Sequence, residues 1–366
     1  MFRRRFSRWS RFLAIVGLCS LAFGSLYVKN NDTSILSGGD PFLMIKRSVE
    51  SEAAQVKTTQ PPTEEEKALA EEMKARTERV DKICREMKEQ NITLPNAQSF
   101  ENEYWKHLMV IEKTKSVWCY LPKVASTNFR RTILGMMGII PKSEVPTIGG
   151  YEVYNIHDKE FKYIKDFDEE KQKEIMSTYT KFFATRDPIE RLLSGYMSKF
   201  LHPNPVNRQE FNKRVSLFYG SHPELDQLHK MKIDYESRSV FFEEFLVWWS
   251  DLYDENLYVN EHFVPTHVLC NPCAVKYDYI GKYEHINRDM DYIFKSLNID
   301  AEFPGRNDNY SVRRTHTMVE EVYKPLPGWL MQKIWNVMKY DFIMFGYPVP
   351  DWLRENIHTG DVPDQI

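Results

Sequence analysis

The stretch SVWCYLPKVASTNFRR, residues 116–131, is the clearest indication of the class of fold. Its first six residues are almost all apolar, aromatic or β-branched, and they predict a buried strand that ends at Pro122. The small polar residues 123–128 predict a loop, and residues 129–137 predict a helix whose first turn carries two arginines. A strand, a loop and a helix in this order are typical of α/β proteins.

The same order of elements recurs further along the chain. Residues 181–184, KFFA, predict a short strand, and Pro188 stands where a helix often begins. We therefore predict an α/β fold with a parallel sheet flanked by helices. The helix after Pro188 would bury Ile189, Leu192, Leu193, Tyr196 and Phe200, and further elements are expected at 239–252 (helix), 277–280 (strand), 286–297 (helix) and 330–340 (helix).

Both strand-to-helix loops have the parts of an anion site. Such a loop directs free backbone NH groups, and the positive end of the helix dipole, at one point. Lys123 adds a charge, while Ser126 and Thr127 add hydroxyl donors. In the second segment Arg186 and Ser194 suit a second phosphate. Two anion sites suit a nucleotide with phosphates on both sides of its ribose.

Each loop also has a plainer interpretation. Lys123 could be an ordinary surface lysine, and Arg186 with Asp187 could form a structural ion pair. The spacing of a Walker A loop is absent and nothing in the sequence marks a magnesium site, which weakens an ATP-dependent P-loop kinase as a third class of function.

The N-terminus predicts a membrane anchor. Five arginines lie among residues 1–11, and residues 12–28 then run without a charge, at the short end of the length that spans a bilayer. The positive-inside rule leaves residues 1–11 as a cytoplasmic tail and places the rest in the lumen, which is type II topology. A cleaved signal peptide is the alternative.

Residues 29–100 are expected to form a lumenal stem. Residues 63–90 have a helical pattern of apolar side chains, interrupted by Arg76, and Thr63 with Glu66 makes a candidate capping box. A solvated helix that holds the body off the membrane is favoured over a short coiled coil, although a coiled coil would allow a homodimer through the stem. The predicted catalytic domain covers 101–350, and 351–366 form a C-terminal tail.

Composition narrows the class of protein further. The chain has 366 residues, 42% of them hydrophobic, so it can bury a substantial core. Without the five N-terminal arginines, 44 basic groups face 52 acidic ones, a net charge of −8 that argues against a nucleic-acid binder. Candidate glycosylation sites are Asn31, Asn91 and Asn309, of which Asn91 is preferred.

The cysteines outside the predicted anchor suit an oxidising compartment. Cys270 and Cys273 form a single Cys-x-x-Cys pair, and no second pair completes a zinc site, so disulfide bonding is favoured over metal binding. Three pairings are open among Cys84, Cys119, Cys270 and Cys273.

At this point the sequence resembles a known group, the Golgi carbohydrate sulfotransferases that include the HNK-1 and chondroitin 4-O-sulfotransferases. Five blocks in the right order carry the resemblance: CYLPKVASTNFRR at 119–131, RDPIERLLS at 186–194, EHFVP at 261–265, LCNPCAVKYDYIGKYE at 269–284 and YDFIMFGY at 340–347. Ser126, Phe129 and Phe263 depart from the residues that many members have there, which weakens inferences about the acceptor but not about either donor loop.

The resemblance implies a P-loop-like sulfotransferase fold, a Golgi membrane location and PAPS (3′-phosphoadenylyl sulfate) as the sulfate donor, with no metal. The loop around the 5′-phosphosulfate would comprise Pro122, Lys123, Val124, Ala125, Ser126, Thr127 and Asn128. The segment around the 3′-phosphate would comprise Arg186, Asp187, Pro188, Ile189, Glu190, Arg191, Leu192, Leu193 and Ser194.

Two residues are the candidate catalytic groups. Lys123 would stabilise charge on the bridging oxygen as sulfate is transferred. His262 lies in a matched block and is expected to be either the general base or a hydrogen-bonded core residue, with equal weight. The other candidate bases are His157, His202, His267 and Glu190.

The acceptor is expected to be a glycan. By resemblance, O4 of GalNAc in chondroitin or dermatan is favoured, followed by a glucuronyl 3-O position of the HNK-1 type or O4 of a terminal GalNAc. A membrane-tethered glycan-binding protein without turnover is an alternative of a different class. Basic residues that could contact a uronate, although most such residues are ordinary solvated surface, are Lys213, Arg214, Lys230, Lys232, Arg313 and Arg314.

Overall fold

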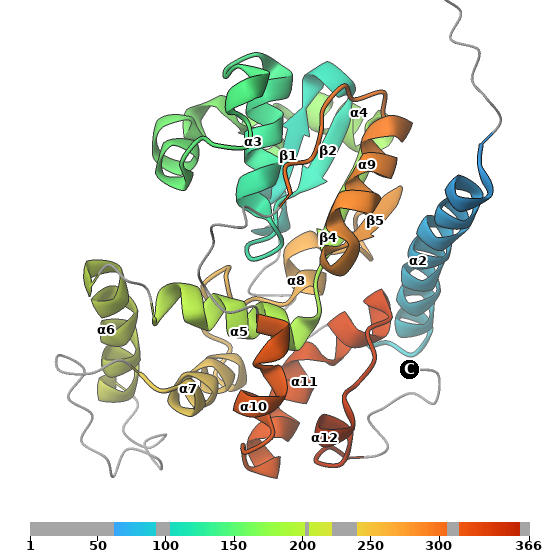
Figure 1. Ribbon diagram of the computed structural model, residues 1–366. Coiled ribbons are helices and arrows are strands. Elements are labelled where there is room, and N and C mark those ends of the chain that lie inside the picture. Colours follow the sequence, from blue (N-terminus) through green and yellow to red (C-terminus); the bar gives the residue numbers. More distant parts are fainter. Residues whose placement is uncertain (1–61, 93–102, 202–204, 222–239, 306–314, 359–366) are drawn as a thin grey trace, which may run out of the picture. The chain divides into compact units, whose positions relative to one another are not determined.

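A computed structural model describes residues 62–92, 103–201, 205–221, 240–305 and 315–358 (Figure 1). Its strands are β1 (Leu108–Ile111), β2 (Ser116–Cys119), β3 (Lys162–Tyr163), β4 (Thr180–Thr185) and β5 (Tyr279–Lys282). Its α-helices are α2 (Glu64–Glu89), α3 (Ser126–Met137), α4 (Glu169–Thr178), α5 (Pro188–Lys199), α6 (Pro205–Ser221), α7 (Phe242–Asp254), α8 (Thr266–Cys270), α9 (Ile286–Ser296), α10 (Val319–Tyr323), α11 (Gly328–Phe345) and α12 (Asp351–Arg354).

The five strands form one sheet in the order β3-β1-β2-β4-β5. Strands β2, β4 and β5 are parallel, but β1 pairs antiparallel with both β2 and β3. The predicted α/β class is confirmed, whereas the prediction of a wholly parallel sheet is wrong. The reason is a tight reversal before β2, where Lys115 takes a left-handed φ of 47° and turns β1 back along its neighbour.

The parallel strands bring three loops to one edge of the sheet. Trp118 of β2 pairs with Phe182 of β4, and Thr185 of β4 pairs with Lys282 of β5, so the carboxyl ends of these strands lie at the same edge. Helix α3 follows β2 and α5 follows β4, as the sequence predicted. Figure 1 shows α5, α6, α7, α10 and α11 below the sheet, with α3 beside β1 and β2. In open α/β sheets, ligands bind at this edge.

Buried aromatic rings join the sheet to the helices. Trp118 stacks on Phe129 of α3 with ring centroids 4.5 Å apart, and Phe303 meets the other side of Phe129 at 4.7 Å. All three side chains are buried. This packing fixes α3, and therefore the loop before it, against the sheet.

Helix α2 is packed on the body. The predicted capping box is present, because Thr63 and Glu66 exchange side-chain to backbone hydrogen bonds of 2.9 and 3.2 Å. Yet the helix is neither a solvated spacer nor, in the described residues, part of a coiled coil, because it contacts β5 and α11. Met73, Val80 and Met87 are buried against that surface.

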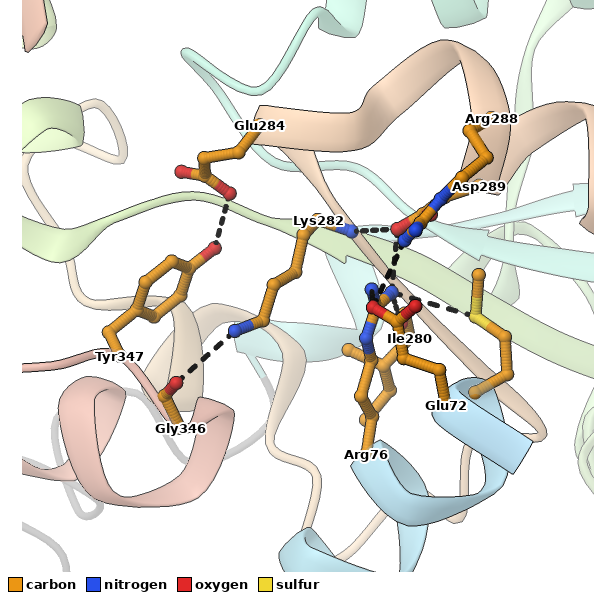
Figure 2. A network of polar contacts seen from close by, with 10 residues as sticks. Glu72, Arg76, Ile280, Lys282, Glu284, Arg288, Asp289, Gly346 and Tyr347 are labelled. Carbon is orange, nitrogen blue, oxygen red and sulfur yellow. Dashed lines mark hydrogen bonds and ion pairs between the residues drawn. The ribbon is translucent and has the colours of Figure 1, made fainter. Parts of the chain in front are cut away.

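Arg76, which interrupts the apolar pattern, explains this packing (Figure 2). Its guanidinium donates to Asp289 Oδ2 at 2.6 Å and to the Ile280 carbonyl at 2.9 Å. Asp289 is fully buried and also accepts from the Lys282 amide at 2.8 Å. A charge that looks out of place in α2 is thus the partner of a buried carboxylate in α9.

Two disulfides settle the pairing that the sequence left open. Cys84 of α2 bonds to Cys273, and Cys119 at the end of β2 bonds to Cys270. Cys270 and Cys273, which are close in sequence, therefore form disulfide bonds with two different parts of the chain. This confirms the disulfide interpretation. Cys84–Cys273 joins residues 189 positions apart and holds α2 to the loop before β5.

Several predictions concern residues outside the described part. The predicted anchor at 12–28, most of the stem, Asn31, His202, Lys230, Lys232, Asn309, Arg313 and Arg314 all lie there. In the part that the structure describes, no helix combines the length and the apolar content needed to cross a bilayer. Asn91 is exposed directly after α2, and its glycosylation stays a prediction.

Candidate functional site

The loop between β2 and α3 has a constrained backbone. Lys123 and Ala125 adopt left-handed φ angles of 71° and 52°, which cost free energy in residues with a Cβ. Ala125 caps α3, so the helix begins at Ser126, three residues earlier than predicted. Within the described residues, the amides of 123–127 donate to no backbone carbonyl and remain available to a ligand.

The hydroxyls in the first turn of α3 converge on one tyrosine. Ser126 Oγ lies 3.1 Å and Thr127 Oγ1 3.3 Å from the Tyr154 hydroxyl. Asn128, by contrast, donates from Nδ2 to the Pro304 carbonyl at 2.7 Å and fastens the helix to the segment after α9. Val124 is buried. Ser126 and Thr127 therefore have the more suitable placement for contacts with an anion.

Arg186 lies directly after β4 and connects the two loops. Its guanidinium donates to the Lys123 carbonyl at 3.1 Å and to Glu190 Oε2 at 3.1 Å, and it also bonds to Thr315 Oγ1. The guanidinium carbon lies 4.2 Å from the centre of the Tyr283 ring. Its Nε is buried and has no partner among the described residues. Arg186 pairs with Glu190 rather than with Asp187.

Arg191 binds the donor loop to the segment that carries His262. Its side chain is 1% exposed and donates to three carbonyls: Pro122 at 3.1 Å, Val264 at 2.6 Å and Glu261 at 3.4 Å. These bonds satisfy guanidinium hydrogens with backbone oxygens. Arg191 thereby sets the distance between the two loops.

The other residues of the second segment form the start of α5. Asp187 caps the helix by accepting from the Glu190 amide at 2.9 Å, and Pro188 occupies the first turn as predicted. Burial, the largest cause, and the nearby Glu190 and Glu284 carboxylates raise the pKa of Asp187 to about 6. Ser194 is partly buried two turns into the helix. The side chains that pack into the core are Ile189, Leu192 and Leu193.

Cations are concentrated around Lys123. Glu190 pairs with Arg186 and Glu261 partly offsets Lys199, but Lys123 itself has no acid partner among the described residues. Burial, together with the like charges of Arg186, Lys199 and Arg191, lowers the pKa of Lys123 to about 7. Burial also lowers the pKa of Lys199, which the charge of Glu261 only partly offsets. A group of cations that destabilise one another is poised to bind an anion, whose charge would restore their ordinary pKa values.

His262 is held beside this cluster. Its Nδ1 lies 2.8 Å from Asn260 Oδ1, which can only accept, so Nδ1 carries the hydrogen and Nε2 the lone pair. The side chain is 19% exposed. Burial first, and then the charges of Lys199 and Lys123, lower the pKa of His262 well below its usual range. His262 is therefore neutral and partly accessible.

A glycine allows this approach. A Cβ on Gly195 of α5 would lie 2.9 Å from the His262 carbonyl oxygen and 3.0 Å from the Phe263 ring. Contacts this short to backbone and to a buried ring cannot be relieved by a flexible side chain. Gly195 thus lets the His262 segment lie against α5.

Sequence reasoning missed Glu261 and His107 as members of the site. The Glu261 carboxylate lies 3.9 Å from His107 Nε2 on one side and 3.9 Å from His262 Nδ1 on the other. Burial, its largest cause, raises the pKa of Glu261. His107 Nδ1 lies 3.0 Å from the Tyr120 carbonyl. Only Glu261 had a signal in the sequence, as the neighbour of His262.

The alternative bases are placed less favourably. His267 is 1% exposed, and its Nδ1 lies 2.8 Å from Asp341 Oδ1. Asp341 also accepts from the backbone amides of Thr266 and His267, so this pair caps α8. Glu190 is bound to Arg186. Among the described residues, no group of three or more side chains could hold a metal ion.

Comparisons with known proteins agree with this geometry. The model of the Sulfotransferase family matches residues 106–348. Carbohydrate sulfotransferase 11 of Rattus norvegicus is 28% identical over 254 residues, which is 68% of this chain and 69% of the relative. Carbohydrate sulfotransferase 14 of Mus musculus is 28% identical over 258 residues, covering 69% and 63% of the two chains.

A third relative, Carbohydrate sulfotransferase 12 of Xenopus laevis, is 28% identical over 267 residues, covering 68% of this chain and 62% of the relative. No solved structure matches the chain. The matched region spans the sheet, both strand-to-helix loops and the His262 segment. The chain therefore belongs to the sulfotransferase family and is a sulfotransferase enzyme.

Proposed function

We propose that the protein transfers a sulfuryl group from PAPS to a sugar hydroxyl, with the donor bound at the carboxyl ends of β2 and β4. The observation that carries this proposal is the position of Lys123 among Arg186, Lys199 and Arg191 with no acid partner of its own in the described residues; burial first, and then these charges, lower its pKa to about 7. At the same edge of the sheet lie the amides of 123–127, which donate to no backbone carbonyl of the described residues, and Arg186 Nε, which has no partner in that part of the chain. These features fit a donor with separate anionic groups.

The two loops divide the donor between them. Residues 122–128 would surround the 5′-phosphosulfate with backbone amides, Ser126, Thr127 and the Lys123 ammonium. Residues 186–194 would lie around the 3′-phosphate, where Arg186 Nε and the Ser194 hydroxyl are the available donors. Arg191 would act indirectly: by donating to the Pro122 and Glu261 carbonyls, it would hold the donor loop and the His262 segment at a fixed distance from each other.

PAPS supplies the sulfuryl group and a phosphate leaving group. As the bond from sulfur to the bridging oxygen breaks, Lys123 Nζ would stabilise the negative charge that develops on that oxygen. His262 Nε2 would accept the proton of the acceptor hydroxyl as its oxygen bonds to sulfur. Burial and the nearby lysines lower the pKa of His262. A bound anion would offset the effect of the lysines and make His262 a stronger base.

The acceptor is proposed to be O4 of GalNAc in chondroitin or dermatan, with a glucuronyl 3-O position as the alternative. Relatives named carbohydrate sulfotransferases 11, 12 and 14 support a glycan acceptor. We further propose a type II location in the Golgi membrane. Both disulfides and the exposed Asn91 are compatible with a lumenal body.

Transfer of radiolabelled sulfate from PAPS by the full-length chain tests the proposal. The acceptors would be desulfated chondroitin, dermatan, heparan and HNK-1-type glycans, followed by disaccharide analysis. We expect label at O4 of GalNAc, and about 10²–10³-fold slower labelling with Lys123→Met. Label on another sugar would change the acceptor only. Tight binding of PAP (3′,5′-ADP) without transfer to any glycan would favour a binding protein instead.

A further inference from the structure

A groove lies between α6 and α7, outside the donor loops. Its volume is about 300 Å³, and its lining includes Arg214, Leu217, Trp248, Tyr258 and Asn260. Tyr258 is 68% exposed and Leu217 62% exposed, so two large apolar side chains face solvent in one place. Apolar and aromatic walls with a few polar groups are the usual lining of a small-molecule subsite.

The groove adjoins the candidate site at two points. Asn260, which lines the groove, accepts hydrogen bonds from the amide and from Nδ1 of His262. The Phe211 ring provides the second connection, because Lys199 Nζ lies 5.6 Å from its centre and the Arg214 guanidinium lies 5.3 Å from it. The groove therefore lies next to the residues that position His262 and Lys199.

The lining specifies the chemistry of the ligand. The exposed face of Tyr258 suits the apolar face of a pyranose ring, and the Asn260 amide suits a ring hydroxyl. Arg214 supplies a positive charge that suits a carboxylate. Its present partner is Glu210, at 2.7 Å, and both side chains are exposed, so the ion pair is weak and can be exchanged.

We propose that this groove is an acceptor subsite that binds a uronic acid residue of the glycan, next to the sugar that receives sulfate. Arg214 pairs with the uronate carboxylate and Tyr258 stacks on the sugar ring. The proposal rests on the proposed function, because it concerns the acceptor of that reaction.

Binding of a desulfated chondroitin hexasaccharide to the full-length chain in the presence of PAP tests the subsite without turnover. Arg214→Ala is expected to weaken binding about fivefold, as for an exposed charge pair, and Tyr258→Ala about tenfold. Tyr258→Phe should retain binding. Lys213→Ala is the matched control: the sequence made Lys213 a candidate for the uronate as much as Arg214, but in the structure it is an exposed neighbour that does not line the groove.

A carboxyl-reduced hexasaccharide identifies the role of Arg214. With this neutral ligand, Arg214→Ala should bind as well as the wild type, while Tyr258→Ala should still bind about tenfold more weakly. In sulfate transfer, both variants should raise the acceptor KM and leave kcat and PAP affinity unchanged.

The outcomes separate the two proposals. Equal weakening by Arg214→Ala and Lys213→Ala, or an Arg214 effect that persists with the neutral ligand, would overturn the subsite while transfer to the glycan upholds the proposed function. Arg214-dependent binding without sulfate transfer to any acceptor would overturn the proposed function; the groove would then bind uronates but would not be an acceptor subsite.

Discussion

Two clusters of charged residues lie near the carboxyl end of the sheet, and they differ in how their charges are matched. In the network between α2 and α9, Arg76 and Arg288 face Glu72 and Asp289 at hydrogen-bond distance (Figure 2). Around Lys123, by contrast, the charges are not fully matched: Arg186 pairs with Glu190, but Lys123 has no acid partner among the described residues. Burial first, and then the charges of Arg186, Lys199 and Arg191, lower the pKa of Lys123.

The difference separates a structural cluster from a binding site. A buried network with matched charges holds its elements together, and removing one member leaves a partner uncompensated. A cluster with excess positive charge lowers the stability of the folded protein until an anion neutralises it. Glu284 joins the two regions, because it accepts from the Asp187 amide at 2.9 Å and from the Tyr347 hydroxyl at 3.0 Å.

The largest expected effect is the loss of stability from removing Arg76. Arg76→Met would leave the fully buried Asp289 without its partner from α2. The free energy of unfolding should fall by about 3 kcal/mol, the lower end for broken buried pairs, because Arg288 still bonds to Asp289 Oδ1. Urea unfolding of the disulfide-intact protein, followed by tryptophan fluorescence, measures this change.

Arg288→Met is the matched control for Arg76. Arg288 contacts the same Asp289, but its side chain is 41% exposed, so its removal should cost less than about 1 kcal/mol. Equal losses in the two variants would show that burial of the pair does not determine its contribution to stability.

Removing Lys123 should have the opposite effect: a loss of activity without a loss of stability. Lys123→Met is expected to reduce kcat about 10²–10³-fold, since it removes the charge that stabilises the leaving group. It should not destabilise the fold, because it also removes repulsion from Arg186, Lys199 and Arg191. Sulfate transfer from PAPS to the glycan acceptor and urea unfolding, measured on the same preparation, check both parts. A large loss of stability would place Lys123 in a structural network like that of Arg76.

Gly195 tests whether the close approach of α5 matters for the site. In Gly195→Ala the new methyl group would meet the His262 carbonyl at 2.9 Å, so the segment must shift. We expect a cost of about 1–3 kcal/mol in stability and a lower kcat. Gly220→Ala is the control, because a Cβ there meets nothing within 4 Å. Equal activity in both variants would contradict the positional argument.

The sequence predicted the features that depend on neighbouring residues. The strand before Pro122, the helix start at Pro188 and the capping box of Thr63 and Glu66 are all local patterns, and the structure has each of them. Arg76 was misjudged because an arginine in an apolar stripe has no meaning until Asp289 faces it from more than two hundred residues away.

Other features had no local signal. Strand β1 is four residues long, and its antiparallel pairing with β2 and β3, which its own sequence does not indicate, makes the sheet mixed. The contacts of Arg191 with Pro122 and Glu261 span about seventy residues in each direction, so its positioning role was invisible beside the donor motif. The spacing of motifs in the sequence indicated where the candidate donor site lies. Only the folded structure shows that its charged side chains lie close together.

The smallest effect, a pH dependence of donor-site binding, is the most specific test of the unmatched cluster. The folded pKa of Lys123 is about 7, below its usual 10.5, so the unfolded chain binds the extra proton between these values. The cost to stability is therefore full below pH 7 and declines as the pH rises toward 10.5.

Binding of PAP reverses this shift, because a phosphate favours the charged lysine. Below pH 7 Lys123 is already protonated and its contribution to affinity is constant. Above pH 7 binding must take up a proton, so affinity should fall by up to about tenfold per pH unit. Calorimetry between pH 7 and 9 avoids the second ionisation of the phosphate near pH 6 and should detect proton uptake.

Lys123→Arg provides the decisive comparison, because arginine stays protonated throughout this range. This variant should bind PAP with a flatter pH profile and take up fewer protons. Any dependence of PAP affinity on pH that remains would be assigned to Lys199, whose pKa is also lowered by burial. Lys199→Arg should remove that dependence. A slope unchanged in both variants would mean that neither lysine faces the bound phosphates, and the unmatched cluster would lose its role as the donor site.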